Sequence, residues 1–416
     1  MSSVEKFYYI KTFGCYANEA DSDLIAGVLE KAGFKELKTI SGNETQEITH
    51  ALKNSDILIV NSCSIRQKSE DKVYGLGKMI KHGVRNKAKV FLTGCMVGSA
   101  VGDRKRFTEK ELQQKTKSYH GYFPPADISR LVELLKRFDL VKQNFALDID
   151  SIQRRQKGGK HAFVNVSYGC DNFCSYCVVP YSRGCEISRA EKNIIEEIKC
   201  LVKKGISEIT LCGQNVNSWG LGAEDKMKLR LGKGSNGLGK KTPFAVLVEK
   251  VHKIPGVEKI DFISSNPFDF TQDIIDLFKL PKIASYVHIA VQSGNNNILK
   301  MMNRKHTSEE FLDLVKKLRV VRPDIEIGTD LIVGFPGETR KQFMDTVKLV
   351  KDVKFSVAFI SMYSPRKGTY AQTHLKDNVP MKEKKWRHMY LSKIWKDNKP
   401  KNSGSVYYHS RWEGEE

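Results

Sequence analysis

The chain has 416 residues, of which 69 are Lys or Arg and 48 are Asp or Glu, so its formal net charge is +21. This length predicts two or three domains, and the basic charge, spread along the chain, favours a polyanionic partner, nucleic acid before membrane. No run of eighteen apolar residues and no apolar secretory core is present, so we expect a cytoplasmic protein without a membrane partner. Nine cysteines in that compartment indicate metal or redox chemistry rather than disulfides.

Residues 1–145 are predicted to form an open parallel α/β domain. Three apolar runs, FYYIKTFGC, ILIVNSC and KVFLTGC, have the composition of buried parallel strands, and helical patterns such as Glu19–Lys31 and Ser69–Lys81 follow them. Each run ends on a cysteine, namely Cys15, Cys63 and Cys95. Because open α/β sheets gather ligands at the carboxyl ends of their strands, three thiols there predict a metal cluster. The alternative is that each is an ordinary buried cysteine at a strand end.

Residues 146–160, which are polar and basic, are predicted to be a linker before a second domain that begins at His161. Six apolar runs alternate there with helical patterns, which predicts a parallel sheet or barrel with its chemistry at the carboxyl ends of the strands. The runs are AFVNVSYG, EITLCG, KIDFIS, YVHIAVQ, IEIGTDLIVG and FSVAFISMY.

The first of these runs leads into SYGCDNFCSYCVVPYSRG, where Cys170, Cys174 and Cys177 have the spacing C-x3-C-x2-C. We interpret this stretch as an iron–sulfur ligand loop. A zinc site usually has four ligands in two pairs, and no second pair of matching spacing follows, so zinc and buried thiols are the alternatives. A [4Fe–4S] cluster held by three thiolates keeps one iron open, and that iron can chelate a substrate and pass it an electron.

Polar and glycine residues follow the later strands, where a ligand would bind. Glycines 334 and 337 allow close backbone approach to a ligand, and Glu338 is expected to cap or charge the start of the next helix. The candidate cofactor-binding residues are Gln214, Asn215, Ser264, Gln292, Ser293, Gly334, Gly337 and Glu338.

An insertion at residues 222–241 contains glycines and lysines. Gly232, Gly234 and Gly237 match G-x-G-x-x-G, and Gly234–Lys240 nearly matches a phosphate loop. No apolar strand leads into this stretch, and Lys241 stands where a phosphate loop needs Ser or Thr, so we interpret it as a basic surface loop that can contact RNA phosphate.

Between about Phe7 and Ala371 the chain contains the motifs NSCSIR, CDNFCSYCVVPYSRG, GQNVNSW, VQSGNN, MNRKHT and DLIVGFPGET. Together these motifs resemble the methylthiotransferase family of radical S-adenosylmethionine (SAM) enzymes. NSCSIR and GQNVNSW favour the branch that adds a methylthio group to carbon 2 of isopentenyl-adenosine beside the tRNA anticodon. The alternatives are the branches that act on threonylcarbamoyl-adenosine or on a ribosomal protein, or a non-catalytic, metal-stabilised RNA-binding protein.

This resemblance implies a partial (β/α)6 radical SAM barrel at 161–371 and two [4Fe–4S] clusters. Catalytic Cys170, Cys174 and Cys177 would hold the cluster whose open iron binds SAM, and Cys15, Cys63 and Cys95 would hold an auxiliary cluster. One SAM would methylate sulfur and another would supply the 5'-deoxyadenosyl radical. The implied partners are tRNA with an isopentenylated adenosine and an electron donor such as flavodoxin or ferredoxin, and we expect a monomer.

Two departures from the family concern the end of the chain and Cys185, a position where the family more often carries a charged residue. The family usually ends in a TRAM RNA-binding barrel, whereas residues 372–416 are predicted to form a basic helical tail that includes Met381–Lys396. Lys384, Lys385 and Arg387 are candidates for phosphate contact, and the alternative is a helix packed on the barrel by Trp386 and Tyr390. We interpret Cys185, Cys200 and Cys212 as structural.

Overall fold

A computed structural model describes residues 5–64, 67–82, 87–147, 152, 159–229 and 241–400. The glycine-rich motif at Gly232, Gly234 and Gly237 lies outside these ranges. The chain divides into two compact units. The N-terminal unit comprises Met1–Gly159, Tyr168–Asn172 and Cys177–Ile187, and the barrel unit comprises Lys160–Ser167, Phe173–Tyr176 and Ser188–Glu416. None of the helices in the described ranges is long and apolar enough to cross a membrane.

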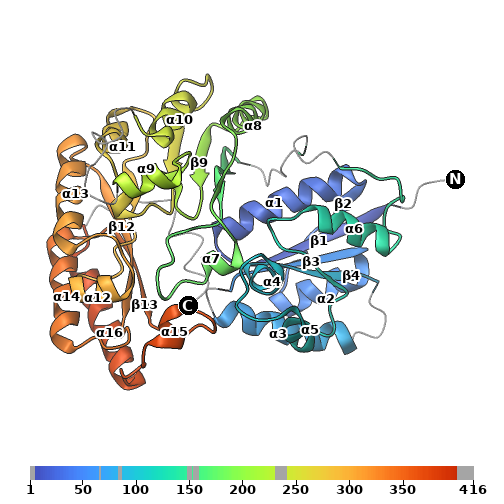
Figure 1. Ribbon diagram of the computed structural model, residues 1–416. Helices are drawn as coiled ribbons and strands as arrows, with labels where there is room; N and C mark the ends of the chain where they lie inside the picture. Colours follow the sequence, from blue (N-terminus) through green and yellow to red (C-terminus); the bar gives the residue numbers. More distant parts are fainter. Residues whose placement is uncertain are drawn as a thin grey trace. The chain divides into compact units, whose positions relative to one another are not determined.

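The N-terminal unit contains a parallel sheet with the strand order β2-β1-β3-β4-β5 (Figure 1). The three strands expected from the sequence lie at its centre, and β3 is buried at every position because helices cover both faces of the sheet. The strands are β1 (Lys6–Phe13), β2 (Phe34–Glu36), β3 (Ile57–Ser62), β4 (Lys89–Gly94) and β5 (Gly121–Tyr122). The predicted open parallel α/β domain is confirmed.

The helices of the N-terminal unit follow the strands in a repeated β/α order. α2 begins with a capping box in which Asn43 and Gln46 exchange side-chain and backbone hydrogen bonds. The helices are α1 (Tyr16–Lys31), α2 (Glu44–Asn54), α3 (Gln67–His82), α4 (Cys95–Val101), α5 (Glu109–Lys115), α6 (Ser129–Arg137) and α7 (Val179–Ser182). α7 belongs to the segment that returns to this unit after the cysteine loop.

In the part of the barrel unit that the structure describes, six parallel strands follow one another in chain order. They are β6 (His161–Asn165), β9 (Glu208–Cys212), β10 (Lys259–Phe262), β11 (Tyr286–His288), β12 (Glu326–Val333) and β13 (Val357–Met362). β6, β9 and β10 form one ladder, β11, β12 and β13 form another, and parallel bridges Ile260–Ile283 and Ser265–Ile289 connect them. The predicted partial six-stranded barrel is confirmed.

Helices cover the outer face of these strands, where one hydrophobic core lies between the two layers (Figure 1). Capping boxes at Thr307 and Thr339 begin α13 and α14. The helices are α8 (Glu191–Lys203), α9 (Ala223–Lys228), α10 (Pro243–His252), α11 (Gln272–Asp276), α12 (Asn296–Met301), α13 (Ser308–Val321), α14 (Arg340–Val353), α15 (Tyr370–His374) and α16 (Met381–Asn398), with 3-10 turns at Val216–Ser218, Pro267–Asp269 and Leu277–Lys279. Short strands β7 (Ser167–Tyr168) and β8 (Ile187–Ser188) precede and follow the cysteine loop in the sequence.

The helical tail is present as α16, but two of its three candidate phosphate contacts are wrong. Lys384 and Arg387 are only 2% and 3% exposed. Lys384 pairs with Asp377 at 2.6 Å, and Arg387 pairs with Glu338 at 2.8 Å. Arg387 neutralises the buried Glu338 carboxylate, and Lys384 neutralises Asp377, whose side chain is 30% exposed. α16 packs against α14 and β13, as the alternative expected. Only Lys385 of the three remains exposed.

Candidate active site and its cysteines

The three N-terminal cysteines follow the ends of three adjacent strands. In the ladder register, Phe13 of β1 lies opposite Ser62 of β3, and Ser62 lies opposite Gly94 of β4. Cys63 and Cys95 directly follow Ser62 and Gly94, and Cys15 lies two residues after Phe13. The Cys63 N–H donates to the Phe13 carbonyl over 2.8 Å. The parallel sheet therefore brings three sequence-distant thiols to one edge.

Buried amides hold the backbone around these thiols. Asn61 Nδ2 donates to the Asn18 carbonyl over 2.8 Å and to Ser22 Oγ over 2.9 Å, and Asn18 Nδ2 donates to Asn61 Oδ1 over 2.9 Å. Gly94 has φ +95°, and a Cβ there would lie 2.3 Å from the Ser62 carbonyl oxygen. Only glycine fits this close strand-to-helix turn, and the turn places Cys95 at the first position of α4.

A buried arginine reaches the same group of thiols. Arg183 Nε donates to Cys95 Sγ over 3.3 Å, and its Nη2 donates to Asp21 Oδ2 over 2.8 Å. Burial raises the pKa of the Cys15 thiol, while the Arg183 guanidinium opposes that rise and the neighbouring Cys95 adds to it. Cys15, Cys95 and Arg183 therefore interact electrostatically. The sequence did not single out Arg183 or Asp21.

The loop with the C-x3-C-x2-C spacing is divided between the two units, and each of its parts is hydrogen-bonded within its own unit. Within the N-terminal unit, the Cys170 N–H donates to the Gly184 carbonyl over 3.2 Å, and the Val179 N–H donates to Cys177 Sγ over 3.4 Å. Cys174 belongs to the barrel unit, where Arg304 Nη1 donates to its Sγ over 3.4 Å. Hydrogen bonds to sulfur favour the thiolate, which is the form that ligates iron.

Arg304 continues a network of buried amides in the barrel unit. Its Nη1 donates to Asn266 Oδ1 over 2.7 Å, and Asn266 Nδ2 donates to Asn215 Oδ1 over 2.7 Å. Asn215 Nδ2 in turn donates to Asp269 Oδ2 over 2.6 Å, and Asn217 pairs with the backbone of Asn266. Asn215, a candidate cofactor contact, is thus fully buried within this network. Asn266, Asp269 and Arg304 were missed as site residues, although the MNRKHT motif contained Arg304.

Three barrel strands lead into residues with left-handed backbone. Ser264 after β10 has φ +69°, Gln292 after β11 has φ +72°, and Gly334 after β12 has φ +69°. This conformation is costly for Ser and Gln, and such strain is concentrated at functional sites. The strained turns coincide with three of the candidate cofactor-binding positions.

The other candidate cofactor-binding residues differ in their surroundings. Gln214 is half-buried, whereas the Ser293 hydroxyl is fully buried beside Thr346 Oγ1 of α14, at 3.3 Å. The Gly337 N–H donates to Asn378 Oδ1 over 2.8 Å. Of the two roles expected for Glu338 at the start of the next helix, capping is wrong, since Thr339 caps α14.

Glu338 instead accepts hydrogen bonds inside the barrel unit. Its Oε2 accepts from the Gly334 N–H over 2.6 Å and from Arg387 Nη1 over 2.8 Å. Burial raises the pKa of this carboxyl, and these two hydrogen bonds oppose the rise. Glu338 therefore stabilises the Gly334 turn from within the protein.

The inner face of the barrel strands carries titratable groups. Val287, Ile260 and Leu331 belong to the core under the helices, so strand alternation turns the intervening residues to the opposite face. These are Tyr286, His288, Asp261 and Asp330. His288 Nε2 lies 2.9 Å from Asp330 Oδ2, and its Nδ1 lies 3.0 Å from the Tyr286 hydroxyl. Burial raises the pKa of Asp261 to about 7.

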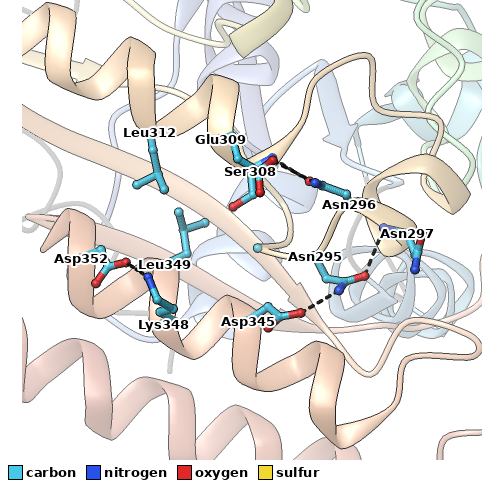
Figure 2. Close-up of a pocket in the computed structure, with 11 residues that line it drawn as sticks. Asn295, Asn296, Asn297, Ser308, Glu309, Leu312, Asp345, Lys348, Leu349 and Asp352 are labelled. Carbon is cyan, nitrogen blue, oxygen red and sulfur yellow. Dashed lines mark hydrogen bonds and ion pairs between the residues drawn. The ribbon is translucent and has the colours of Figure 1, made fainter.

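A pocket of about 370 Å³ in the barrel unit lies among helices (Figure 2). Its polar side chains pair with one another: Asn295 donates to Asp345 over 2.7 Å, and Asn296 donates to Glu309 over 2.8 Å. Figure 2 also shows the Lys348–Asp352 ion pair along α14. No cysteine lines this pocket. The asparagines of VQSGNN therefore join α12 to α13 and α14.

The thiols suit an iron–sulfur cluster better than a single metal ion. Within the described ranges, no three His, Cys, Asp or Glu side chains form a group that could hold one metal ion. A four-iron cluster is bound differently, because each thiolate ligates its own iron. Three cysteine side chains at register-aligned strand ends, with a cation donating to one sulfur, fit such an all-sulfur ligand set.

Comparisons with known proteins identify the family. Residues 164–350 match the radical SAM superfamily, and residues 7–114 match uncharacterized protein family UPF0004. The tRNA-2-methylthio-N(6)-dimethylallyladenosine synthase of Thermotoga petrophila is 39% identical over 398 residues, which are 94% of this chain and 81% of that protein. The chain belongs to this synthase family. The synthase of Clostridium botulinum strain Okra is 38% identical, over 90% of this chain and 78% of that protein. The synthase of Buchnera aphidicola is 37% identical, over 93% of this chain and 82% of that protein.

Members of this synthase family are radical SAM enzymes, so SAM and a [4Fe–4S] cluster are implied. Solved structures agree at the level of the fold. The radical SAM methyltransferase TsrM of Kitasatospora setae matches with a TM-score of 0.60 at 14% identity, over 89% of this chain and 77% of that one. The radical SAM enzyme OxsB matches with a TM-score of 0.53 at 10% identity, over 95% of this chain and 57% of that one.

Proposed function

We propose that this enzyme adds a methylthio group to carbon 2 of isopentenyl-adenosine in tRNA. The observation that supports this function most is the alignment of Cys15, Cys63 and Cys95 at adjacent strand ends, because it supplies a second set of three thiols besides the cysteine loop. Identity of 37–39% with synthases that carry this activity in their names supports the substrate.

Each set of cysteines has its own proposed role. Cys170, Cys174 and Cys177 hold the [4Fe–4S] cluster at which SAM binds, and Cys15, Cys63 and Cys95 hold a second one. When bound, the first cluster would supply the electron that cleaves SAM, and the second would hold the sulfur that another SAM methylates. Arg304 orients the Cys174 thiolate through its hydrogen bond to sulfur, and the buried Asn215–Asn266–Asp269 network fixes the guanidinium.

We propose that SAM contacts the residues that follow the carboxyl ends of the barrel strands. Ser264, Gln292 and Gly334 hold backbone groups in left-handed turns there, and Glu338 stabilises the last of these turns. A ligand bound beside them needs no further backbone rearrangement, because the left-handed conformations are already formed. Gln214, Ser293 and Gly337 remain candidate contacts.

The proposed partners follow from the substrate and the charge. A net charge of +21 favours phosphate contacts, and a base in an RNA loop can be turned outward into a pocket. The reaction also needs an electron donor such as flavodoxin or ferredoxin. We further propose that the enzyme acts as a monomer and, because tRNA is its substrate, in the cytoplasm.

Anaerobic reconstitution followed by product analysis tests this function. We expect about eight iron and eight sulfide per chain from two four-iron clusters. Incubation with SAM, reductant and isopentenylated tRNA should give the 2-methylthio nucleoside. A Cys200→Ala variant is the matched control, because that thiol is exposed on α8. A methylthio product formed on threonylcarbamoyl-adenosine or on a ribosomal protein would place the enzyme in another branch of the family. A content of about four iron per chain without SAM cleavage would instead identify a non-catalytic RNA-binding protein.

A further inference from the structure

Arg183 lies on the segment that follows the cysteine loop, yet it is buried in the N-terminal unit. The side chains of Arg183 and Asp21 are each only 5% exposed. α7, which directly precedes Arg183, packs closely on α4, since a Cβ on Gly98 would lie 1.9 Å from the Ser182 carbonyl oxygen. This close packing fixes the backbone from which the arginine extends toward Cys95, the first residue of α4.

The arginine donates in two directions to two acceptors. Nη2 donates to the Asp21 carboxylate, whereas Nε donates to Cys95 Sγ over 3.3 Å. An ion pair alone needs only the first of these contacts. A planar guanidinium with several fixed N–H groups serves both acceptors at once, and a lysine ammonium lacks this geometry.

We propose that Arg183 is a positioning residue for the cluster held by Cys15, Cys63 and Cys95, and that it raises the reduction potential of this cluster. The inference rests on the second cluster in the proposed function. Reduction adds negative charge to a cluster, and both a nearby buried cation and a hydrogen bond to a ligand sulfur stabilise that charge. Asp21 partly offsets the cation, so the pair sets the potential together.

The test uses the full chain with Cys170, Cys174 and Cys177 replaced by Ala, so that only the second cluster assembles. Reductive titration followed by electron paramagnetic resonance gives its midpoint potential. We expect Arg183→Gln to lower the ratio of reduced to oxidised cluster at a fixed potential roughly tenfold. For a one-electron couple this corresponds to a midpoint potential about 59 mV lower. Arg183→Lys should give a smaller negative shift, and Asp21→Asn a positive one.

Arg104→Gln is the matched control. Arg104 is a cation of the same unit that pairs with Asp171 at 2.8 Å, and its side chain is 27% exposed. Its loss removes the same formal charge from a partly exposed side chain, where solvent screens the charge, so we expect little change in potential.

Opposite shifts for Arg183→Gln and Asp21→Asn support the proposal, because a purely structural role does not predict their signs. Unchanged potentials in both variants overturn it. If the Arg183→Gln protein fails to hold about four iron, the test rests on Arg183→Lys and Asp21→Asn. Unshifted midpoint potentials in those two variants overturn the proposal. Failure of the proposed function is distinguishable, because the parent background would then hold no cluster at all.

Discussion

Nη1 of Arg304 donates a hydrogen bond to Sγ of Cys174 over 3.4 Å, and the same atom donates to Oδ1 of Asn266 over 2.7 Å. Replacing Arg304 by Gln removes the charge beside this thiolate and leaves buried amides without their donor. We expect reductive SAM cleavage to fall about 10- to 100-fold, as is common when an outer partner of a metal ligand is lost. Formation of 5'-deoxyadenosine measures it, and Lys305→Gln, at an exposed neighbour, is the control. Equal rates in the two variants would show that the contact is incidental.

Cys170, Cys174 and Cys177 are each expected to be essential for SAM cleavage. Replacing any one by Ala leaves two thiolates for a cluster that has only three protein ligands. We expect 5'-deoxyadenosine to fall to background in each variant, while tRNA binding is retained. Wild-type rates of 5'-deoxyadenosine formation in any variant would refute its assignment as a ligand.

The N-terminal cysteines should give a different phenotype. Cys15→Ala, Cys63→Ala and Cys95→Ala should each lose about half of the bound iron and still cleave SAM, yet form no methylthio product. Iron counting, 5'-deoxyadenosine and nucleoside analysis are measured on the same preparations. Product formation in any of the three would show that its thiol is only a packing residue.

Arg387 should contribute to stability rather than to RNA binding. Its loss leaves the Glu338 carboxylate, which is 1% exposed, without its cation. We expect Arg387→Ala to destabilise the protein by about 3 kcal/mol, whereas Lys385→Ala on the exposed face of α16 should change stability by less than about 0.5 kcal/mol. Unfolding followed by circular dichroism compares them. Similar stabilities would mean that the buried pair is not needed.

Asp261 should make stability depend on pH. Its carboxyl has a pKa of about 7 in the folded protein and 3.8 ordinarily, so the folded state binds a proton that the unfolded state releases between these values. Stability from this group is therefore complete below about pH 4 and is lost as the pH rises through about 7. We expect Asp261→Asn to gain about 2–3 kcal/mol relative to the parent between pH 5 and pH 8. A parallel pH dependence of the two proteins would contradict this.

The sequence predicted the elements whose signal is local. Three apolar runs that each end on a cysteine predicted β1, β3 and β4, and six runs predicted the barrel strands. The edge strands β2 and β5 were missed, because three and two residues give no periodic pattern. Edge strands of this length depend on their neighbours rather than on their own residues.

Side-chain pairs distant in sequence were not predictable in the same way. Arg304 and Cys174 are 130 residues apart, and Arg183 and Asp21 are 162 residues apart. Lys384 was misjudged because a basic helix normally indicates a solvated face. Its acceptors are the Asp377 carboxylate and the Tyr363 carbonyl, and neither pairing is visible in the helix itself.

The alignment of Phe13, Ser62 and Gly94 makes the proposed second cluster depend on the correct register of the sheet. A slip of one residue between parallel strands moves a cysteine by about 3.3 Å and turns its side chain to the opposite face. A chain with a misregistered β1, β3 or β4 would then present two thiols instead of three. Iron content in the N-terminal unit is thus also a measure of how many molecules in a preparation have paired these strands correctly.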